Sequence, residues 1–204
     1  MALCDKFLAK DIQANCDDPI VKGIEANGVV INRADIDFAA VEFNSTNKNI
    51  IENLVLKAGK CGYEISVPTP TPFSGTSTTM EEGANRKTFT NNLGFVILDN
   101  GPEVAEIIDT LANGEFVVVY ENKFKGLQKE ELKGASTYQI VGYYQGLRAA
   151  TLENDKYSDD TEGGWNVVLT ETKSPKSALF LYAGNAEASE KEFNSLLKTP
   201  ETGA

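Results

Sequence analysis

Histidine is absent from the chain. This absence removes Ser-His-Asp triads, zinc sites built on imidazole and most general acid–base mechanisms. The glycines form neither a GxxxxGK[ST] loop nor a GxGxxG loop between a strand and a helix, so no phosphate cradle is predicted. We therefore predict a protein that is not an enzyme and that has no cofactor.

Cysteine is scarce, and the three thiols of Cys4, Cys16 and Cys61 are widely spaced without a CxxC pair. The odd number favours free thiols in a reducing compartment over a disulfide scaffold. A metal site built from them would need a carboxylate as fourth ligand, and we predict none. No apolar run is long enough to span a membrane, and Asp5 and Lys6 interrupt the place of a signal peptide, so we expect no membrane partner.

Acidic residues outnumber basic ones, and the formal net charge is −11. This balance argues against a surface that holds nucleic-acid phosphates, because such binding depends on Lys and Arg replacing counterions. It permits a surface along which DNA passes without sticking. The densest acidic cluster is Glu153, Asp155, Asp159, Asp160 and Glu162. Its spacing does not match an EF-hand, so a solvated loop is favoured over a calcium site.

The order of secondary structure predicts a mainly β fold with one packed helix. Residues 102–113 form the helix, with Asn100 or Asp99 as cap, Pro102 in its first turn and Gly114 as a left-handed stop. An apolar stripe along it should pack on a sheet: Val104, Ile107, Ile108 and Leu111. Strand patterns occupy residues 94–98, 116–121, 138–144, 146–152, 165–172 and 178–182.

The predicted domain plan has an N-terminal arm over residues 1–27, a β-sandwich core over 28–183 and a C-terminal tail over 184–204. A marginal helix is expected at 5–14. In the tail, Ser189 and Glu192 predict a capping box that opens a short helix.

Four further segments give predictions of their own. The alternation after Gly28 shifts phase between Ala40 and Val41, which a β-bulge would produce. Residues 50–57 fit either a strand or a helical turn and are predicted as a strand, and residues 63–67 are also a predicted strand. Residues 68–79 hold three prolines and predict an exposed loop, with an edge segment against a neighbouring subunit as the alternative.

The segment between two paired strands, residues 122–137, is too long for a tight hairpin turn. We call it the excursion. Its lysines alternate with apolar residues that need a surface on which to be buried, so we predict that it bridges subunits; the alternative is that it folds back on its own subunit. The candidate interface residues are Lys123, Phe124, Lys125, Leu127, Leu132 and Lys133.

The order of these elements resembles that of bacteriophage tail tube (major tail) proteins. The resemblance spans about residues 29–182 and rests on the helix PEVAEIIDTLANG, followed by the stretches GL, GGWNVVLTET and ALFLY at residues 146–147, 163–172 and 178–182. Head-to-tail connector rings and tail terminators share much of this pattern. The extended N-terminal arm and helical C-terminal tail depart from it.

The resemblance implies a β-sandwich or barrel whose sheets join those of neighbours, with six subunits to a ring and rings stacked into a tube. It implies a virion protein assembled in the host cytoplasm, with copies of itself, other tail or connector proteins and passing DNA as partners. We expect carboxylates to line the channel, because they repel phosphate.

Two other functions compete with this one. A carbohydrate- or peptide-binding β-sandwich would use Trp165, Tyr143 and Tyr144 as a ligand face. A calcium- or carboxylate-dependent hydrolase is the third possibility.

Overall fold

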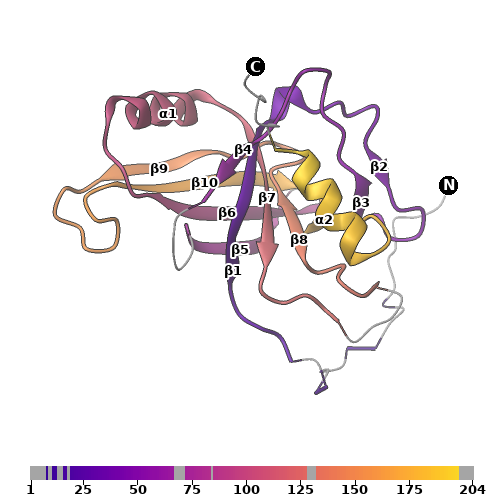
Figure 1. Ribbon diagram of the computed structural model, residues 1–204. Helices are drawn as coiled ribbons and strands as arrows, with labels where there is room; N and C mark the ends of the chain where they lie inside the picture. The colour runs from indigo at the N-terminus through magenta and orange to yellow at the C-terminus, as the bar shows by residue number, and fades with distance from the viewer. Residues whose placement is uncertain are drawn as a thin grey trace.

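The computed structural model (Figure 1) describes residues 8, 11–12, 16–17, 19–66, 72–83, 85–127 and 132–197. Strands make up 43% of the chain and helices 15%, which confirms the mainly β prediction. The strands form two sheets, and neither closes into a barrel. The predicted helix over residues 5–14 falls mostly outside the described residues.

The larger sheet has seven strands. Every neighbouring pair is antiparallel except β3 and β11, which are parallel. Its strands in spatial order are β2 (Glu42–Phe43), β3 (Ile50–Asn53), β11 (Leu179–Leu181), β8 (Tyr138–Val141), β7 (Phe116–Asn122), β1 (Ile24–Asn32) and β4 (Tyr63–Ile65).

The smaller sheet has four antiparallel strands. In spatial order they are β5 (Phe73–Glu82), β6 (Lys87–Ile97), β10 (Trp165–Ser174) and β9 (Arg148–Asn154). The predicted pairing of residues 146–152 with 165–172 is confirmed. The predicted loop over 68–79 is wrong from Phe73 onward, because β5 is a strand; its side chains are polar on both faces, so no apolar alternation marks it.

Strand β7 lies at the centre of the fold because both of its faces are buried. Val118 and Tyr120 belong to the core between the two sheets, together with Leu93 and Leu169 of the smaller sheet. Val117 and Val119 belong to a second core on the opposite face. The side chains of the unbroken apolar run that begins at Phe116 are therefore shared between two cores on opposite faces of the sheet.

Helix α1 (Pro102–Asn113) packs on the first core through Val104, Ile108 and Leu111, as predicted. The fourth residue of the predicted stripe, Ile107, is wrong, because it is 50% exposed and does not belong to the core. Pro102 lies in the first turn as predicted, but the predicted caps at both ends are wrong. Gly101 is the N-cap, and Gly114 has an extended backbone with φ of −90°. Glycine is required there by space, since a Cβ would lie 2.1 Å from the Phe116 ring.

Helix α2 (Ala186–Ser195) covers the second core, where Phe193 is buried and stacks on Tyr138 with 4.6 Å between ring centroids. The predicted capping box is wrong, because the helix begins three residues before Ser189. Asn185 is the cap, and its Oδ1 accepts a hydrogen bond from the Ala188 N–H at 2.8 Å. The tail therefore contributes a helix to the core.

The segment after β1 does not continue as a strand. A 3-10 helix, η1 (Arg33–Asp35), follows directly, with Asn32 Nδ2 donating to Asp35 Oδ2 at 3.1 Å. The predicted bulge between Ala40 and Val41 is therefore wrong, since both residues lie outside strands. A register shift does occur nearby, between Glu42 and Phe43 of β2.

A buried carboxylate joins the two sheets. Glu171 on β10 is 2% exposed, and its oxygens accept hydrogen bonds from Asn91 Nδ2 at 2.9 Å and from the N–H groups of Gly142, Tyr144 and Gln145 at 2.9–3.1 Å. These three N–H groups belong to the turn that follows β8. A single side chain of the smaller sheet thus holds the turn that follows β8 in the larger sheet.

We predict that Glu171→Gln lowers the free energy of unfolding by about 2–3 kcal/mol, because the amide turns an acceptor into a donor that faces buried N–H groups. Chemical denaturation followed by circular dichroism measures the change. Glu153→Gln, at an exposed site on neighbouring β9, should change stability by less than about 0.5 kcal/mol. Equal stability of Glu171→Gln and wild type would show that the turn is held by other contacts.

A second prediction concerns Glu192 on α2. Burial raises the pKa of this carboxyl group, while a hydrogen bond from the Leu54 N–H, 3.1 Å away, opposes the rise. A raised folded-state pKa contributes stability below the unfolded-state pKa, and this stability is lost as pH rises through the folded-state value. Glu192→Gln keeps the acceptor without the buried charge. It should match or exceed wild-type stability at pH 7 and lose that advantage near pH 4, whereas Glu192→Ala should be less stable at both.

Candidate subunit interface

The described residues hold no group of three or more Cys, Asp or Glu side chains placed to bind a metal ion. Cys16 is exposed and Cys61 is partly exposed, and both are free thiols, while Cys4 lies outside the described residues. In the part of the chain that the structure describes, no helix is long and apolar enough to cross a membrane.

The acidic loop lies between β9 and β10 and borders a groove of about 710 Å³. Glu153, Asp155 and Asp160 line it together with apolar side chains. Asp155 serves the turn itself, since its Oδ1 accepts a hydrogen bond from the Tyr157 N–H at 2.9 Å. Thr161 is 6% exposed, and its hydroxyl has no hydrogen-bond partner among the described residues.

The three aromatic residues of the predicted ligand face are not brought together. Tyr143 is buried and makes edge contacts with Phe38 and Tyr144, with ring centroids 5.3 and 5.2 Å apart, and burial raises the pKa of its hydroxyl. Trp165 opens β10, six residues before Glu171, whose carboxylate holds the Tyr144 N–H. That separation is about 20 Å along a strand.

The base of the excursion is fixed to its own subunit. The Asn122 N–H donates to the Thr137 carbonyl at 2.7 Å, and the Lys123 N–H donates to the Gly23 carbonyl at 3.0 Å. Farther out, the Gly134 N–H donates to the Gly126 carbonyl at 3.4 Å. These bonds hold the described ends of the excursion beyond the end of β7.

The six predicted interface residues divide into two groups. Lys125 forms ion pairs with Glu121 and with Glu25, the latter at 3.9 Å, and Phe124 is partly buried. The other four are exposed: Lys123, Leu127, Leu132 and Lys133. Leu127 is 50% exposed and Leu132 39%, so the excursion presents apolar side chains beside lysines to the outside of the subunit.

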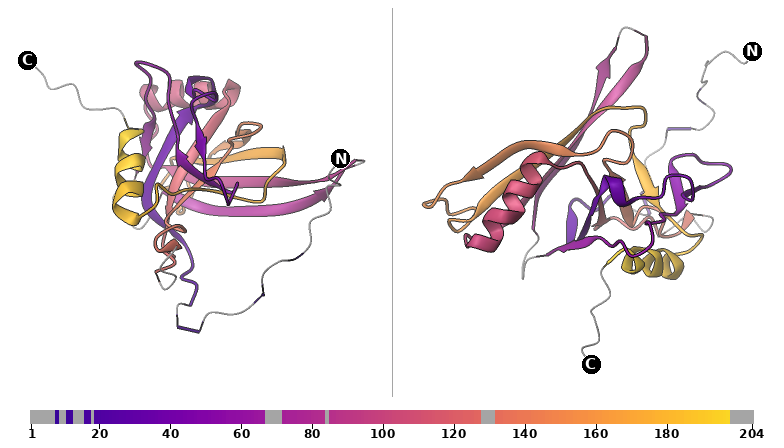
Figure 2. Two further views of the ribbon diagram at one scale, coloured as in Figure 1. Left: turned by 90° about the vertical axis from the view of Figure 1, so that its right-hand side faces the viewer. Right: turned by 90° about the horizontal axis from the view of Figure 1, so that it is seen from above.

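Strand β5 is a possible contact surface that sequence patterns missed. It pairs with β6 along its length, and no described strand pairs with its other edge. Every residue after Phe73 is exposed. The β5–β6 hairpin projects beyond the rest of the subunit (Figure 2). The run of serine and threonine over residues 74–79 was the available signal, since threonine favours extended backbone.

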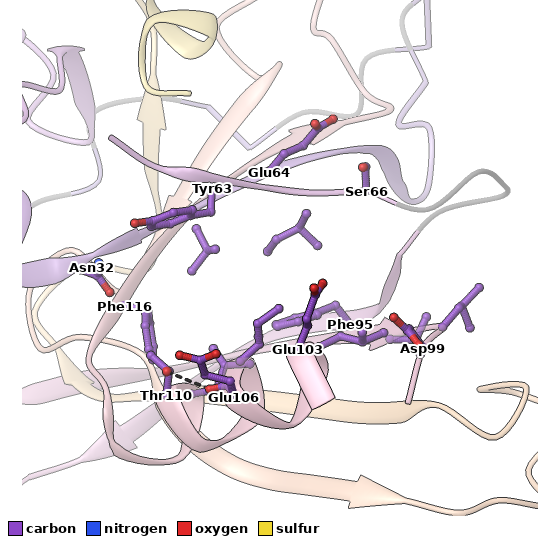
Figure 3. A pocket seen from close by; sticks show the side chains of 17 residues that line it. Asn32, Tyr63, Glu64, Ser66, Phe95, Asp99, Glu103, Glu106, Thr110 and Phe116 are labelled. Atoms are coloured by element: carbon purple, nitrogen blue, oxygen red, sulfur yellow. Dashed lines mark hydrogen bonds between the residues drawn. The ribbon is translucent and has the colours of Figure 1, made fainter. Parts of the chain in front are cut away.

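A groove of about 770 Å³ lies between α1, β4 and the end of β6; we call it the α1–β4 groove. Its walls include the exposed apolar side chains of Tyr63, Leu98 and Ile107. Figure 3 shows Glu64 on β4, with its carboxylate directed away from α1, and Glu103 and Glu106 on α1 across the groove. With Asp99 these make four carboxylates, and no Lys or Arg is among the described residues that line the groove.

No protein-family model, curated protein or solved structure matches the chain.

The unpartnered hydroxyl of Thr161 gives a test of the acidic groove. Thr161→Val replaces it with a methyl group of similar size and should raise the free energy of unfolding by about 1 kcal/mol, because an unsatisfied buried hydroxyl is destabilising. Thermal unfolding with and without calcium chloride measures this. We expect no effect of calcium on either protein. Stabilisation of wild type alone by calcium would instead identify a calcium site at this hydroxyl.

Proposed function

We propose that the chain is a structural virion protein that assembles with copies of itself into rings, as the protomer of a stacked-ring phage tail tube through which DNA passes. The observation that carries this proposal is the uncovered edge of β5. The excursion gives a second contact surface, and the acidic composition suits a conduit for DNA.

The edge of β5 differs from the other three sheet edges. An unpaired edge is a template for pairing with another chain, and proteins usually shorten or cover such edges. In the larger sheet the edge strands β2 and β4 are only two and three residues long. In the smaller sheet β9 lies against α1. β5 has ten residues and its described surroundings leave it uncovered.

The start of β5 is well anchored, so the strand is presented in a fixed position. Phe73 packs against Tyr120 with ring centroids 5.9 Å apart, and the Thr76 side chain forms a hydrogen bond with the Tyr120 hydroxyl. Farther along, Thr78 Oγ1 donates to Asn91 Oδ1 at 2.8 Å. A strand with one edge paired in its own sheet and the other edge unpaired is suited to extending the sheet into a neighbouring subunit.

The conduit role rests on charge and on the resemblance to tail tube proteins. A net charge of −11 keeps phosphates from adhering, and weak contact allows DNA to move quickly. In this proposal six subunits form a ring, and other tail or connector proteins meet the ends of the tube. The alternative of a carbohydrate- or peptide-binding module has less support, because Trp165 lies far from Tyr143 and Tyr144.

We predict that Thr79→Lys weakens self-association at least about fivefold while the subunit stays folded, because a lysine on an exposed edge strand opposes pairing. Thr79 is exposed and lies at mid-strand opposite Thr90, so the fold tolerates the substitution. Sedimentation velocity across a concentration series gives the midpoint of assembly, and negative-stain images show whether rings form.

Thr46→Lys is the matched control, with the same change of charge at an exposed loop position away from β5. It should assemble like wild type. Wild-type protein that stays monomeric at high concentration, even with tail proteins present, would contradict the proposed function. Equal assembly of both variants would mean that β5 is not the pairing edge.

A further inference from the structure

The α1–β4 groove has the chemistry of a receptor for a basic, apolar segment. Its apolar floor includes Ile65, Phe95 and Phe116, and its rim holds the carboxylates of Glu64, Asp99, Glu103 and Glu106. Exposed apolar surface edged by charge of one sign is typical of a binding site for a partner of opposite charge.

Charge distinguishes the excursion from the two terminal segments of the sequence. The excursion has four lysines against two glutamates over residues 122–137. The N-terminal residues 1–23 have three lysines against four aspartates, and residues 198–204 have one lysine and one glutamate. The excursion is thus the one with net positive charge, and it also exposes Leu127 and Leu132.

The described ends of the excursion lie away from the groove of their own subunit. Phe116 at the start of β7 lines the groove, and Asn122 at the other end of β7 begins the excursion. The two ends of this strand are about 20 Å apart. In Figure 1 β7 runs away from α1 and β4 toward the excursion. The bonds from Asn122 to Thr137 and from Lys123 to Gly23 keep the described ends of the excursion at that end of β7.

We infer that the excursion of one subunit docks into the α1–β4 groove of a second copy, with Leu127 and Leu132 against the apolar floor and the lysines against the carboxylates. This inference rests on the proposed self-assembly and names the surface that receives the bridging segment. Because the two surfaces lie at opposite ends of a subunit, the contact is head-to-tail, which closes into a ring or continues as a stack.

Charge reversal tests the contact. Glu106→Lys in the groove and Lys133→Glu in the excursion should each raise the midpoint concentration of assembly about threefold or more, and the combined variant should recover part of the loss. Asp109→Lys is the control, since Asp109 is exposed on the same helix but does not line the groove. It should assemble like wild type.

Cross-linking tests the contact directly, in chains whose three native cysteines are replaced by serine. Chains with Ile107→Cys are mixed with chains with Leu127→Cys and treated with a short bis-maleimide. We expect a cross-linked dimer from the mixture and at least about fivefold less from either chain alone. Because cross-linking also captures short-lived pairs, it reports docking even where few rings accumulate.

The outcomes separate this inference from the proposed function. If wild type forms rings while the cross-link is absent and Glu106→Lys assembles like Asp109→Lys, docking is overturned and ring formation stands. If Leu8→Cys chains cross-link to Ile107→Cys chains and Leu127→Cys chains do not, the N-terminal arm fills the groove and the inference is wrong. If the cross-link forms but no rings appear, docking stands and the ring proposal fails.

Discussion

The position of the two sheets depends on the turn at residues 142–145, which is held between an anion and a cation. Its N–H groups donate to the buried Glu171 carboxylate, and two of its carbonyls accept hydrogen bonds from Arg33, at 2.7 Å from Tyr144 and 3.2 Å from Tyr143. Gly142 is needed at the start of the turn, because its φ is +86° and a Cβ would lie 2.4 Å from the Phe116 carbonyl oxygen. Since buried charges are stable only when fully hydrogen-bonded, this turn has little freedom to change.

The same network reaches the edge that we assign to assembly. Thr78 on β5 donates to Asn91 on β6, and Asn91 donates to Glu171 on β10. The hydrogen bonds therefore run from the outermost strand of the smaller sheet to the turn of the larger one. Through this chain of contacts, the geometry of a sheet extended between subunits is tied to the core of each subunit.

Sequence patterns predicted the parts of the fold in which one face is apolar and the other polar. The helix at 102–113 and the pairing of β9 with β10 are such cases, and they agree with the structure. Strand β5 has no apolar face, so its run of serine and threonine has the sequence pattern of a loop. The capping box predicted at Ser189 is wrong, because Ser189 lies inside the helix and its hydroxyl donates to the Asn185 carbonyl. The α1–β4 groove is lined by separate parts of the chain, and only the tertiary fold brings Glu64 to the same groove as Asp99, Glu103 and Glu106.

Repulsion between like charges gives the proposed contacts a reason to be specific. A subunit with net charge −11 repels its copies at long range, so association requires local surfaces that overcome this repulsion. The lysine-rich excursion is such a surface, and the acidic groove receives it without a competing cation on its described rim. Hydrogen bonds along the edge of β5 fix the orientation of one subunit against the next, but they contribute little binding free energy by themselves. Two surfaces of different chemistry at separate places on the subunit therefore favour one ordered arrangement over random aggregation.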